Sequence, residues 1–360
     1  MYPLFLGLTI LAGDTGTVST FAGTGKAGYG GDGGKAIAAQ FNEPSYCIFE
    51  GTDACYIADT LNHSVRKIDM KTGVIGTVAG CGKKGYSGDG GNATKATLNE
   101  PYALALDPDG NLYIVDRINA VVRKVEHRTG TMTTVAGNGE KTYSGDGGPA
   151  VQASLREPHD CCMDGRGGLL IADVADWRIR RLDLKTGKIS TFAGIGKPQG
   201  KIDRAKVGDG GPANKAVLIG ARAVCIDGNG NTYVCEREGN TIRKIDRDGT
   251  ITTFAGSGAK GYTGDEGPAL KATFNGPKGV TCDAVGNLFV VDTENHAIRR
   301  IDAKTGKITT VAGGRKGTEG DGGPATKAGL DRPHGCAVDA VGRLFIADTE
   351  NHRIRIVPLE

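Results

Sequence analysis

The chain has 360 residues, which is enough for two or three ordinary domains or for one large repeat fold. Its 44 Lys and Arg residues nearly balance its 41 Asp and Glu residues. The formal net charge of +3 therefore gives no electrostatic basis for binding nucleic acid or an anionic membrane, and we expect neither partner. Glycine is abundant, at 59 residues, and aromatic residues are scarce, at 6%, which favours many tight turns over large aromatic cores.

The cysteines and the first segment bear on the cellular compartment of the protein. The nine cysteines are an odd number and most lie in apolar, strand-like runs, so we expect free thiols and a cytoplasmic protein. The opening run "MYPLFLGLTILAG" is apolar but too short to span a bilayer, and no basic residue precedes it. Residues 1–12 are therefore expected to be an N-terminal extension, with a trimmed secretion signal as the alternative. We expect a monomer.

A motif of sequence GDGG, or a close variant, recurs six times along the chain. An acidic residue follows each motif aspartate by 27 positions and an arginine follows it by 34 positions. The motif aspartates are Asp32, Asp89, Asp146, Asp209, Asp265 and Asp321. We interpret the motif as a structural turn and the six arginines as ties between strands, because a ligand site is rarely needed six times.

The predicted strands repeat in the same order. Residues 17–23, "TVSTFAG", form one strand before the first complete copy. The second copy then shows all four apolar, β-branched runs, at residues 102–107, 112–116, 121–126 and 131–137, separated by turn residues. Each copy thus predicts a four-stranded antiparallel sheet. Six such sheets can bury their faces only by packing on one another in a ring, so we predict an all-β, six-bladed β-propeller that forms a single domain over residues 1–360.

The ends of the chain predict how the ring closes. The last copy stops after its third run, "RIRIVPLE", while residues 17–23 are a fourth run without a blade of their own. We therefore expect this N-terminal strand to complete the last blade and to leave no free sheet edge.

Three segments also resemble a known repeat family. The runs "ADTLNHSVRKID", "VDTENHAIRRID" and "ADTENHRIRIV" resemble NHL repeats. The resemblance implies a six-bladed propeller over essentially the whole chain. Its functional implication is broad, because NHL propellers include RNA-binding modules, protein scaffolds and enzymes.

One position differs from copy to copy and faces a shared space. It lies 13 residues after each motif aspartate, where the innermost strand begins at the mouth of the central channel. A packing position would hold similar apolar residues in every blade. Here the six residues are Ser45, Tyr102, His159, Arg222, Lys278 and His334, which we call the mouth ring. Near the same mouth, the departures from the repeat are Arg117, Glu236, Arg237, the single tryptophan Trp177, and a connector into the fourth blade that is six residues longer than the others.

Two histidines of the mouth ring suggest a metal. His159 and His334 belong to opposite blades and would face each other across the channel, so we expect them to share a divalent metal, zinc first and calcium or another ion as alternatives. The segments "EPHD" and "RPHG" resemble the Pro-His segments of peptidylglycine amidating lyase. That resemblance implies metal ligation by both histidines. It also matches Asp160 to an acid that follows one of the metal-binding histidines, and Arg117 and Arg237 to an active-site arginine. The ring holds no third histidine.

The resulting functional hypothesis is a metal-dependent enzyme with its site at the channel mouth. We expect Tyr102, Asp160, Arg222 and Lys278 to be catalytic. We expect the substrate to contact Arg117, Arg237, Glu236, Trp177 and Ser45. The expected reaction is hydrolysis of a small anionic ester, lactone or phosphoester. The alternatives are a lyase similar to peptidylglycine amidating lyase, and a non-catalytic NHL scaffold that binds protein or nucleic acid.

The remaining histidines and cysteines are expected to be structural. We interpret His63, His296 and His352, each in an "NH" pair, as hydrogen-bonded residues of outer turns. Cys161 and Cys336 follow His159 and His334 by two residues, and Cys47 holds the same position in the first blade. These three could line the channel as a thiolate site, but packing in the core explains them more simply.

Overall fold

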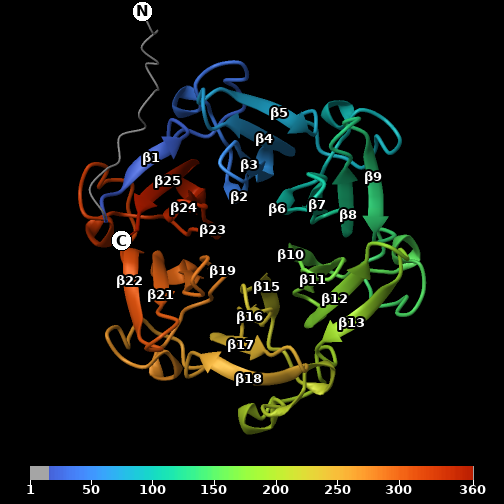
Figure 1. The fold of residues 1–360 in the computed structure, drawn as a ribbon, viewed down its shortest axis with the longest axis vertical. Helices are drawn as coiled ribbons and strands as arrows, with labels where there is room; N and C mark the ends of the chain where they lie inside the picture. The colour runs from blue at the N-terminus through green and yellow to red at the C-terminus, as the bar shows by residue number, and fades with distance from the viewer. Residues whose placement is uncertain (1–15, 360) are drawn as a thin grey trace, which may run out of the picture.

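Six antiparallel sheets surround a central channel in the computed structural model, which describes residues 16–359 (Figure 1). Blade 1 comprises β2 (Pro44–Glu50), β3 (Ala54–Asp59), β4 (Ser64–Asp69) and β5 (Ile75–Ala79). Blade 2 comprises β6 (Pro101–Leu106), β7 (Leu112–Asp116), β8 (Val121–Val125) and β9 (Met132–Ala136). Blade 3 comprises β10 (Pro158–Met163), β11 (Gly168–Asp173), β12 (Arg178–Asp183) and β13 (Ile189–Ala193). Blade 4 comprises β15 (Ala221–Ile226), β16 (Thr232–Glu236), β17 (Thr241–Ile245) and β18 (Thr250–Ala255), and gains a short outer strand, β14 (Gly211–Pro212). Blade 5 comprises β19 (Gly279–Cys282), β20 (Leu288–Asp292), β21 (Ala297–Ile301) and β22 (Ile308–Gly313). The predicted all-β, six-bladed propeller is confirmed.

The last blade confirms the predicted closure. It contains β23 (Gly335–Val338), β24 (Arg343–Asp348), β25 (Arg353–Pro358) and, as its outer strand, β1 (Ser19–Ala22). Ser19 pairs with Ile356 in antiparallel register, and Figure 1 shows the N-terminal strand lying beside the C-terminal one. The expected extension, residues 1–12, lies outside the described residues.

The helical elements are all single 3-10 turns in the part of the chain that the structure describes. They are η1 (Ala36–Ala38), η2 (Thr60–Asn62), η3 (Ala93–Lys95), η4 (Ala150–Gln152), η5 (Arg204–Lys206), η6 (Ala213–Lys215), η7 (Ala269–Lys271), η8 (Thr293–Asn295), η9 (Ala325–Lys327) and η10 (Thr349–Asn351). Across residues 16–359, accordingly, no helix has the length and apolar character needed to cross a bilayer.

The hydrophobic core lies between neighbouring blades. Successive strand residues point to opposite faces of a sheet, so each blade contributes side chains to two interfaces. Cys161 packs with Leu169 and Val115 between blades 2 and 3, whereas Leu170 packs with Val224 between blades 3 and 4. Each sheet is stable because both of its faces are buried by its neighbours.

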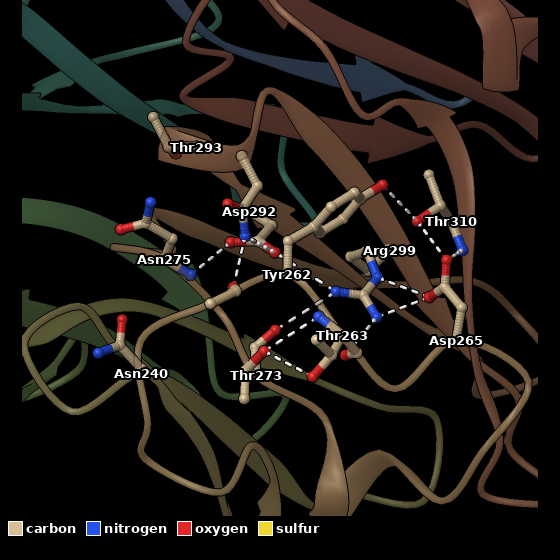
Figure 2. A network of polar contacts seen from close by, with 12 residues as sticks. Asn240, Tyr262, Thr263, Asp265, Thr273, Asn275, Asp292, Thr293, Arg299 and Thr310 are labelled. Carbon is tan, nitrogen blue, oxygen red and sulfur yellow. Dashed lines mark hydrogen bonds and ion pairs between the residues drawn. The ribbon is translucent and has the colours of Figure 1, made fainter.

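A buried arginine links the GDGG turn of each blade to its strands. In blade 5, Arg299 is fully buried, its Nη2 lies 2.6 Å from Asp265 and its Nη1 lies 3.5 Å from Asp292 (Figure 2). Equivalent ion pairs join Arg66 to Asp32, Arg123 to Asp89, Arg180 to Asp146, Arg243 to Asp209 and Arg355 to Asp321. The interpretation of the repeated aspartates and arginines as structural ties is therefore confirmed.

The three "NH" histidines connect one blade to the next. His63, His296 and His352 adopt the left-handed conformation, with φ near +50°, at the ends of η2, η8 and η10. Nδ1 of each accepts a hydrogen bond from a backbone N–H of the following blade, at Glu100, Arg332 and Glu43 respectively. Their structural role is confirmed.

Candidate active site

A β-bulge at the start of the innermost strand positions several mouth-ring side chains. In blade 3, Pro158 pairs with Asp173 and Asp160 pairs with Ala172, which leaves His159 as the extra residue. The same irregularity places Ser45 and Arg222 outside the regular register in blades 1 and 4. A bulged residue is turned away from the regular alternation of side chains. These residues therefore point to the channel mouth and not into the packing between blades.

The mouth ring lines a single pocket of about 210 Å³. All six ring positions contribute to its wall, together with Arg117 and Arg237. One water needs only about 10–15 Å³ of such space, so the pocket has room for several waters. The pocket thus suits a small ligand.

Tyr102 crosses the channel mouth and connects three blades. Arg222 of blade 4 donates a hydrogen bond to its hydroxyl oxygen at 2.5 Å, and Nδ1 of His334 in blade 6 lies 2.8 Å from the same oxygen. The ring of His159 stands edge-on to the Tyr102 ring, with centroids 5.0 Å apart. Ser45 supports this arrangement, since its hydroxyl donates a hydrogen bond to the Tyr102 backbone carbonyl at 2.7 Å. Burial raises the pKa of Tyr102, although the charges of Arg222 and Arg117 oppose the increase.

His334 and Lys278 extend this chain of contacts. Nζ of Lys278 lies 2.7 Å from Nε2 of His334, so both ring nitrogens of this histidine already have protein partners. Burial, followed by the charges of Arg222 and Arg332, lowers the pKa of Lys278 to about 7. Burial and the nearby Lys278 lower the pKa of His334 well below its ordinary value, so the imidazole is neutral at pH 7.

Arg222 is a buried cation without a counter-ion. The residue is 5% exposed, and no carboxylate of residues 16–359 lies within 4.0 Å of its guanidinium nitrogens. Its Nε atom is buried without any hydrogen-bond partner. The nearby positive charges of Arg237 and Arg117 contribute, after burial, to lowering its pKa. An anion in the pocket would compensate this charge.

A second ring, with charged side chains in four of its six positions, was missed in the sequence. It lies 11 residues after each motif aspartate and consists of Glu43, Glu100, Glu157, Gly220, Gly276 and Arg332. Arg117 forms ion pairs with Glu100 and Glu157, while Arg332 pairs with Glu294. The three glutamates line the pocket on the side of blades 1 to 3, opposite Arg222 and Lys278. The signal was available, because this position varies among the copies as the mouth ring does.

Three predicted site residues do not reach the pocket. Both carboxylate oxygens of Asp160 accept backbone hydrogen bonds, from Cys161 and Val224, in the interior. Glu236 occupies the repeat position of the buried aspartates and accepts from the Ile219 N–H. Trp177 packs against Val207 and Ile219. The two carboxylates are thus held by backbone hydrogen bonds and the indole by apolar packing, so all three side chains support the fold around the pocket.

The long connector and the cysteines also lie outside the pocket. The connector includes η5 and is held by Arg204, whose Nη1 donates to the Gly239 carbonyl at 2.7 Å. Cys47, Cys161 and Cys336 are 0%, 1% and 3% exposed and pack between blades, as the simpler interpretation predicted.

The side chains at the mouth do not fit the expected metal. A cation bound between His159 and His334 would have to displace the Lys278 amine from Nε2 of His334, beside the uncompensated charge of Arg222. His159 alone could offer a ligand, since its Nδ1 donates to the Glu157 carbonyl at 3.1 Å and leaves Nε2 free, but His334 could not join it without losing the contact with Lys278. Within residues 16–359, no group of three His, Cys, Asp or Glu side chains could hold a metal. The residues brought together at the mouth therefore do not form the metal site that the sequence suggested.

Comparison with known proteins identifies the repeat. The model of the NHL repeat matches residues 330–357, and that of the Teneurin NHL domain matches residues 185–261. Together with six blades of four strands, these matches support an NHL-repeat propeller. The chain is 27% identical over 353 residues to human NHL repeat-containing protein 2, and 29% identical over 279 residues to the protein SUPPRESSOR OF QUENCHING 1 of Arabidopsis thaliana.

The matches to these two relatives cover most of this chain but less than half of each relative's length. They span 88% of the chain and 47% of the human protein, and 76% of the chain and 26% of the plant protein. Among solved structures, a Bacteroides thetaiotaomicron protein of unknown function matches 96% of this chain and 76% of its own, with a TM-score of 0.71 and 20% identity. A gluconolactonase from Xanthomonas campestris matches 89% of this chain and 87% of its own, with a TM-score of 0.57 and 14% identity. Both likenesses concern the fold alone.

Proposed function

We propose that the mouth pocket binds a small anionic substrate and performs acid–base chemistry on it. The observation that carries this proposal is Arg222, a buried guanidinium with an unpartnered Nε and no carboxylate nearby. Leaving a charge buried and unpaired is costly, and a bound carboxylate or phosphate would offset that cost through charge-assisted hydrogen bonds. Lys278 and Arg237 add positive charge to the same wall.

Tyr102 is the proposed general acid. When Lys278 donates to Nε2 of His334, the hydrogen of this neutral imidazole is on Nδ1 and is donated to the Tyr102 oxygen. That oxygen also accepts from Arg222, so the phenol's own hydrogen is free to face a ligand. Because burial raises the pKa of Tyr102, the group is a phenol at rest. Once the proton has left, Arg222 stabilises the phenolate.

His159 is the proposed general base. Its Nδ1–H donates to the Glu157 carbonyl, which leaves the Nε2 lone pair in the pocket. Burial and the charge of Arg222 lower its pKa well below the ordinary value, so the imidazole is neutral at pH 7. A base and an acid with rings 5.0 Å apart can act on one small substrate.

This pair supports two reaction classes on an anionic substrate. In hydrolysis of an ester, lactone or phosphoester, His159 would take a proton from water and Tyr102 would protonate the leaving oxygen. In a lyase reaction, His159 would take a proton from carbon. The gluconolactonase from Xanthomonas campestris supports the proposal, because it is an enzyme with a similar fold. The proposed steps use side chains of the chain only.

The test compares anion binding by the wild-type protein and Arg222→Leu. Titration calorimetry with phosphate, acetate and glycolate should detect at least one ligand, and Arg222→Leu should bind it at least about tenfold more weakly, which is about 1.4 kcal/mol. Arg300→Leu is the matched control, since this arginine is more than a third exposed and pairs with Asp302 outside the pocket. Equal binding by Arg222→Leu and the wild type would overturn the proposal. The same proteins are then assayed on lactones and phosphate esters.

A further inference from the structure

We propose that Lys278 is a nucleophile that forms a Schiff base with the carbonyl group of a small oxo acid whose carboxylate is held by Arg222. The inference rests on the anion site proposed above and names its substrate class. It assigns to Lys278 a covalent role that neither the repeat pattern nor the similar proteins suggest.

The contacts of Lys278 are those of a reactive amine. A lysine that serves as a structural cation is normally paired with a carboxylate, but the nearest one here, Glu294, lies 3.9 Å away and is itself paired with Arg332 at 2.8 Å. The Lys278 side chain is 6% exposed, yet it lines the pocket. Its close partner is the neutral imidazole of His334. Desolvation and neighbouring cations are the conditions that activate a lysine for attack on a carbonyl group.

Among the cations of the pocket, only Lys278 can lose its proton near neutral pH. Arginine stays protonated in proteins, whereas a buried lysine readily shifts its pKa. The lowered pKa of about 7 agrees with this difference, and burial is its first cause. In its neutral form Lys278 can donate one N–H to Nε2 of His334 and keep its lone pair for the ligand.

The hydrogen-bond chain supplies the protons that the addition step needs. As Nζ bonds to the carbonyl carbon, the Tyr102 hydroxyl gives its proton to the carbonyl oxygen, His334 gives the Nδ1 proton to Tyr102, and Lys278 gives one N–H proton to Nε2 of His334. The product is a neutral carbinolamine. The nitrogen lone pair then expels the hydroxyl group, which leaves as water after Tyr102 protonates it. An iminium ion remains on Lys278, beside the phenolate that Arg222 stabilises.

The position of Arg222 selects an oxo acid over other carbonyl compounds. Arg222 and Lys278 stand at neighbouring blades of the same pocket wall, so one small molecule can place its carboxylate on the first and its carbonyl carbon near the second. The iminium withdraws electrons from the adjacent bonds, and the Nε2 lone pair of His159 can take a proton from the neighbouring carbon. The chemistry expected from this adduct is bond cleavage next to the original carbonyl group.

The experiment traps the adduct. The wild-type protein is incubated with glyoxylate and cyanoborohydride, and the modified lysine is mapped by mass spectrometry. One reduced adduct on Lys278 is expected, with none at that position in Lys278→Arg, which keeps the charge but removes the nucleophile. Lys244→Arg, at a half-buried lysine of β17 outside the pocket, should be labelled at Lys278 like the wild type. Excess glycolate, which has the carboxylate but no carbonyl group, should suppress labelling.

The outcomes separate this inference from the proposed function. If calorimetry shows glycolate binding that depends on Arg222 while trapping labels no lysine, or labels surface lysines as fast as Lys278, the Schiff base is wrong and the anion site stands. If none of phosphate, acetate, glycolate and glyoxylate binds and no adduct forms, both proposals fall. Labelling of Lys278 that persists in Arg222→Leu at the wild-type rate would overturn the oxo-acid assignment.

Discussion

The hydroxyl oxygen of Tyr102 lies 2.8 Å from Nδ1 of His334, a residue 232 positions later in the chain. The two residues belong to blades 2 and 6, and Arg222 of blade 4 donates to the same oxygen. Three alternate blades therefore meet at one atom. This contact connects Arg222 to the Lys278 amine through Tyr102 and His334, and it is the basis for the catalytic predictions.

The Tyr102→Phe variant tests the proton donor. Removing the hydroxyl should slow adduct formation with glyoxylate by about 10²–10⁴-fold, the usual contribution of a positioned acid or base. Glycolate binding should persist, because Arg222 keeps its charge. Tyr113→Phe is the matched control, since this hydroxyl donates to Asp107 outside the pocket. An unchanged rate in Tyr102→Phe would show that the proton comes from another group.

Lys278 should make the protein less stable at low pH. Its pKa is about 7 in the folded protein and about 10.5 when unperturbed, so the folded state disfavours the charged form. This cost is complete below about pH 7, decreases as the pH rises from there, and vanishes above about pH 10.5. The charges facing the amine are Arg222, Arg237, Arg332 and Glu294, and its imidazole partner His334 is neutral.

The Lys278→Met variant measures that cost. It should raise the free energy of unfolding by about 1–4 kcal/mol at pH 6, the range found when buried ion pairs are replaced by apolar residues of similar volume. The gain should shrink steadily towards pH 10. Urea denaturation across this pH range gives the comparison, with Lys244→Met as the control. A gain that is absent, or that increases with pH, would contradict the assignment of a buried, destabilised ammonium group.

The arginine of each blade should be essential for stability. Arg299→Leu leaves Asp292 buried without its ion pair, which should lower the free energy of unfolding by about 3–5 kcal/mol. The neighbouring Arg300→Leu removes a partly exposed pair with Asp302 and should cost less than about 1 kcal/mol. Chemical denaturation of the two variants is the measurement. Similar losses in both would refute the structural role of the buried network.

The closing strand should be necessary for a soluble ring. A chain that begins at residue 25 lacks β1, and with it Val18 and Ala22, which are fully buried. The edge of β25 and part of the core of blade 6 would then be exposed, so aggregation or a much lower melting temperature is expected. A chain that begins at residue 16 retains β1 and is the control. Monomeric behaviour with an unchanged melting temperature, by size-exclusion chromatography and calorimetry, would refute the closure.

Some structural roles could have been separated from catalytic ones by the repeat alone. Glu236 holds the position of Asp59, Asp116, Asp173, Asp292 and Asp348, and it accepts a backbone N–H from 17 residues earlier, as Asp59 does. Its position in the repeat therefore indicated a tie and not a ligand contact. Asp160 could not be assigned in this way, since only the packed structure shows that its carboxylate is saturated by two backbone N–H groups.

The sequence by itself determined the six blades, their four strands, the closure by residues 17–23 and the variable ring at the channel mouth. These features follow from the alternation of apolar and polar residues in the strands and from the sixfold sequence repeat. Both are local patterns that recur in every copy. Only the tertiary structure decided which ring members touch. Tyr102 meets Arg222 and His334 because the packing between blades sets the width of the channel and the bulges turn ring side chains towards it. The same packing brings Lys278 to His334, where the sequence had suggested a metal, and this contact underlies the proposed anion site.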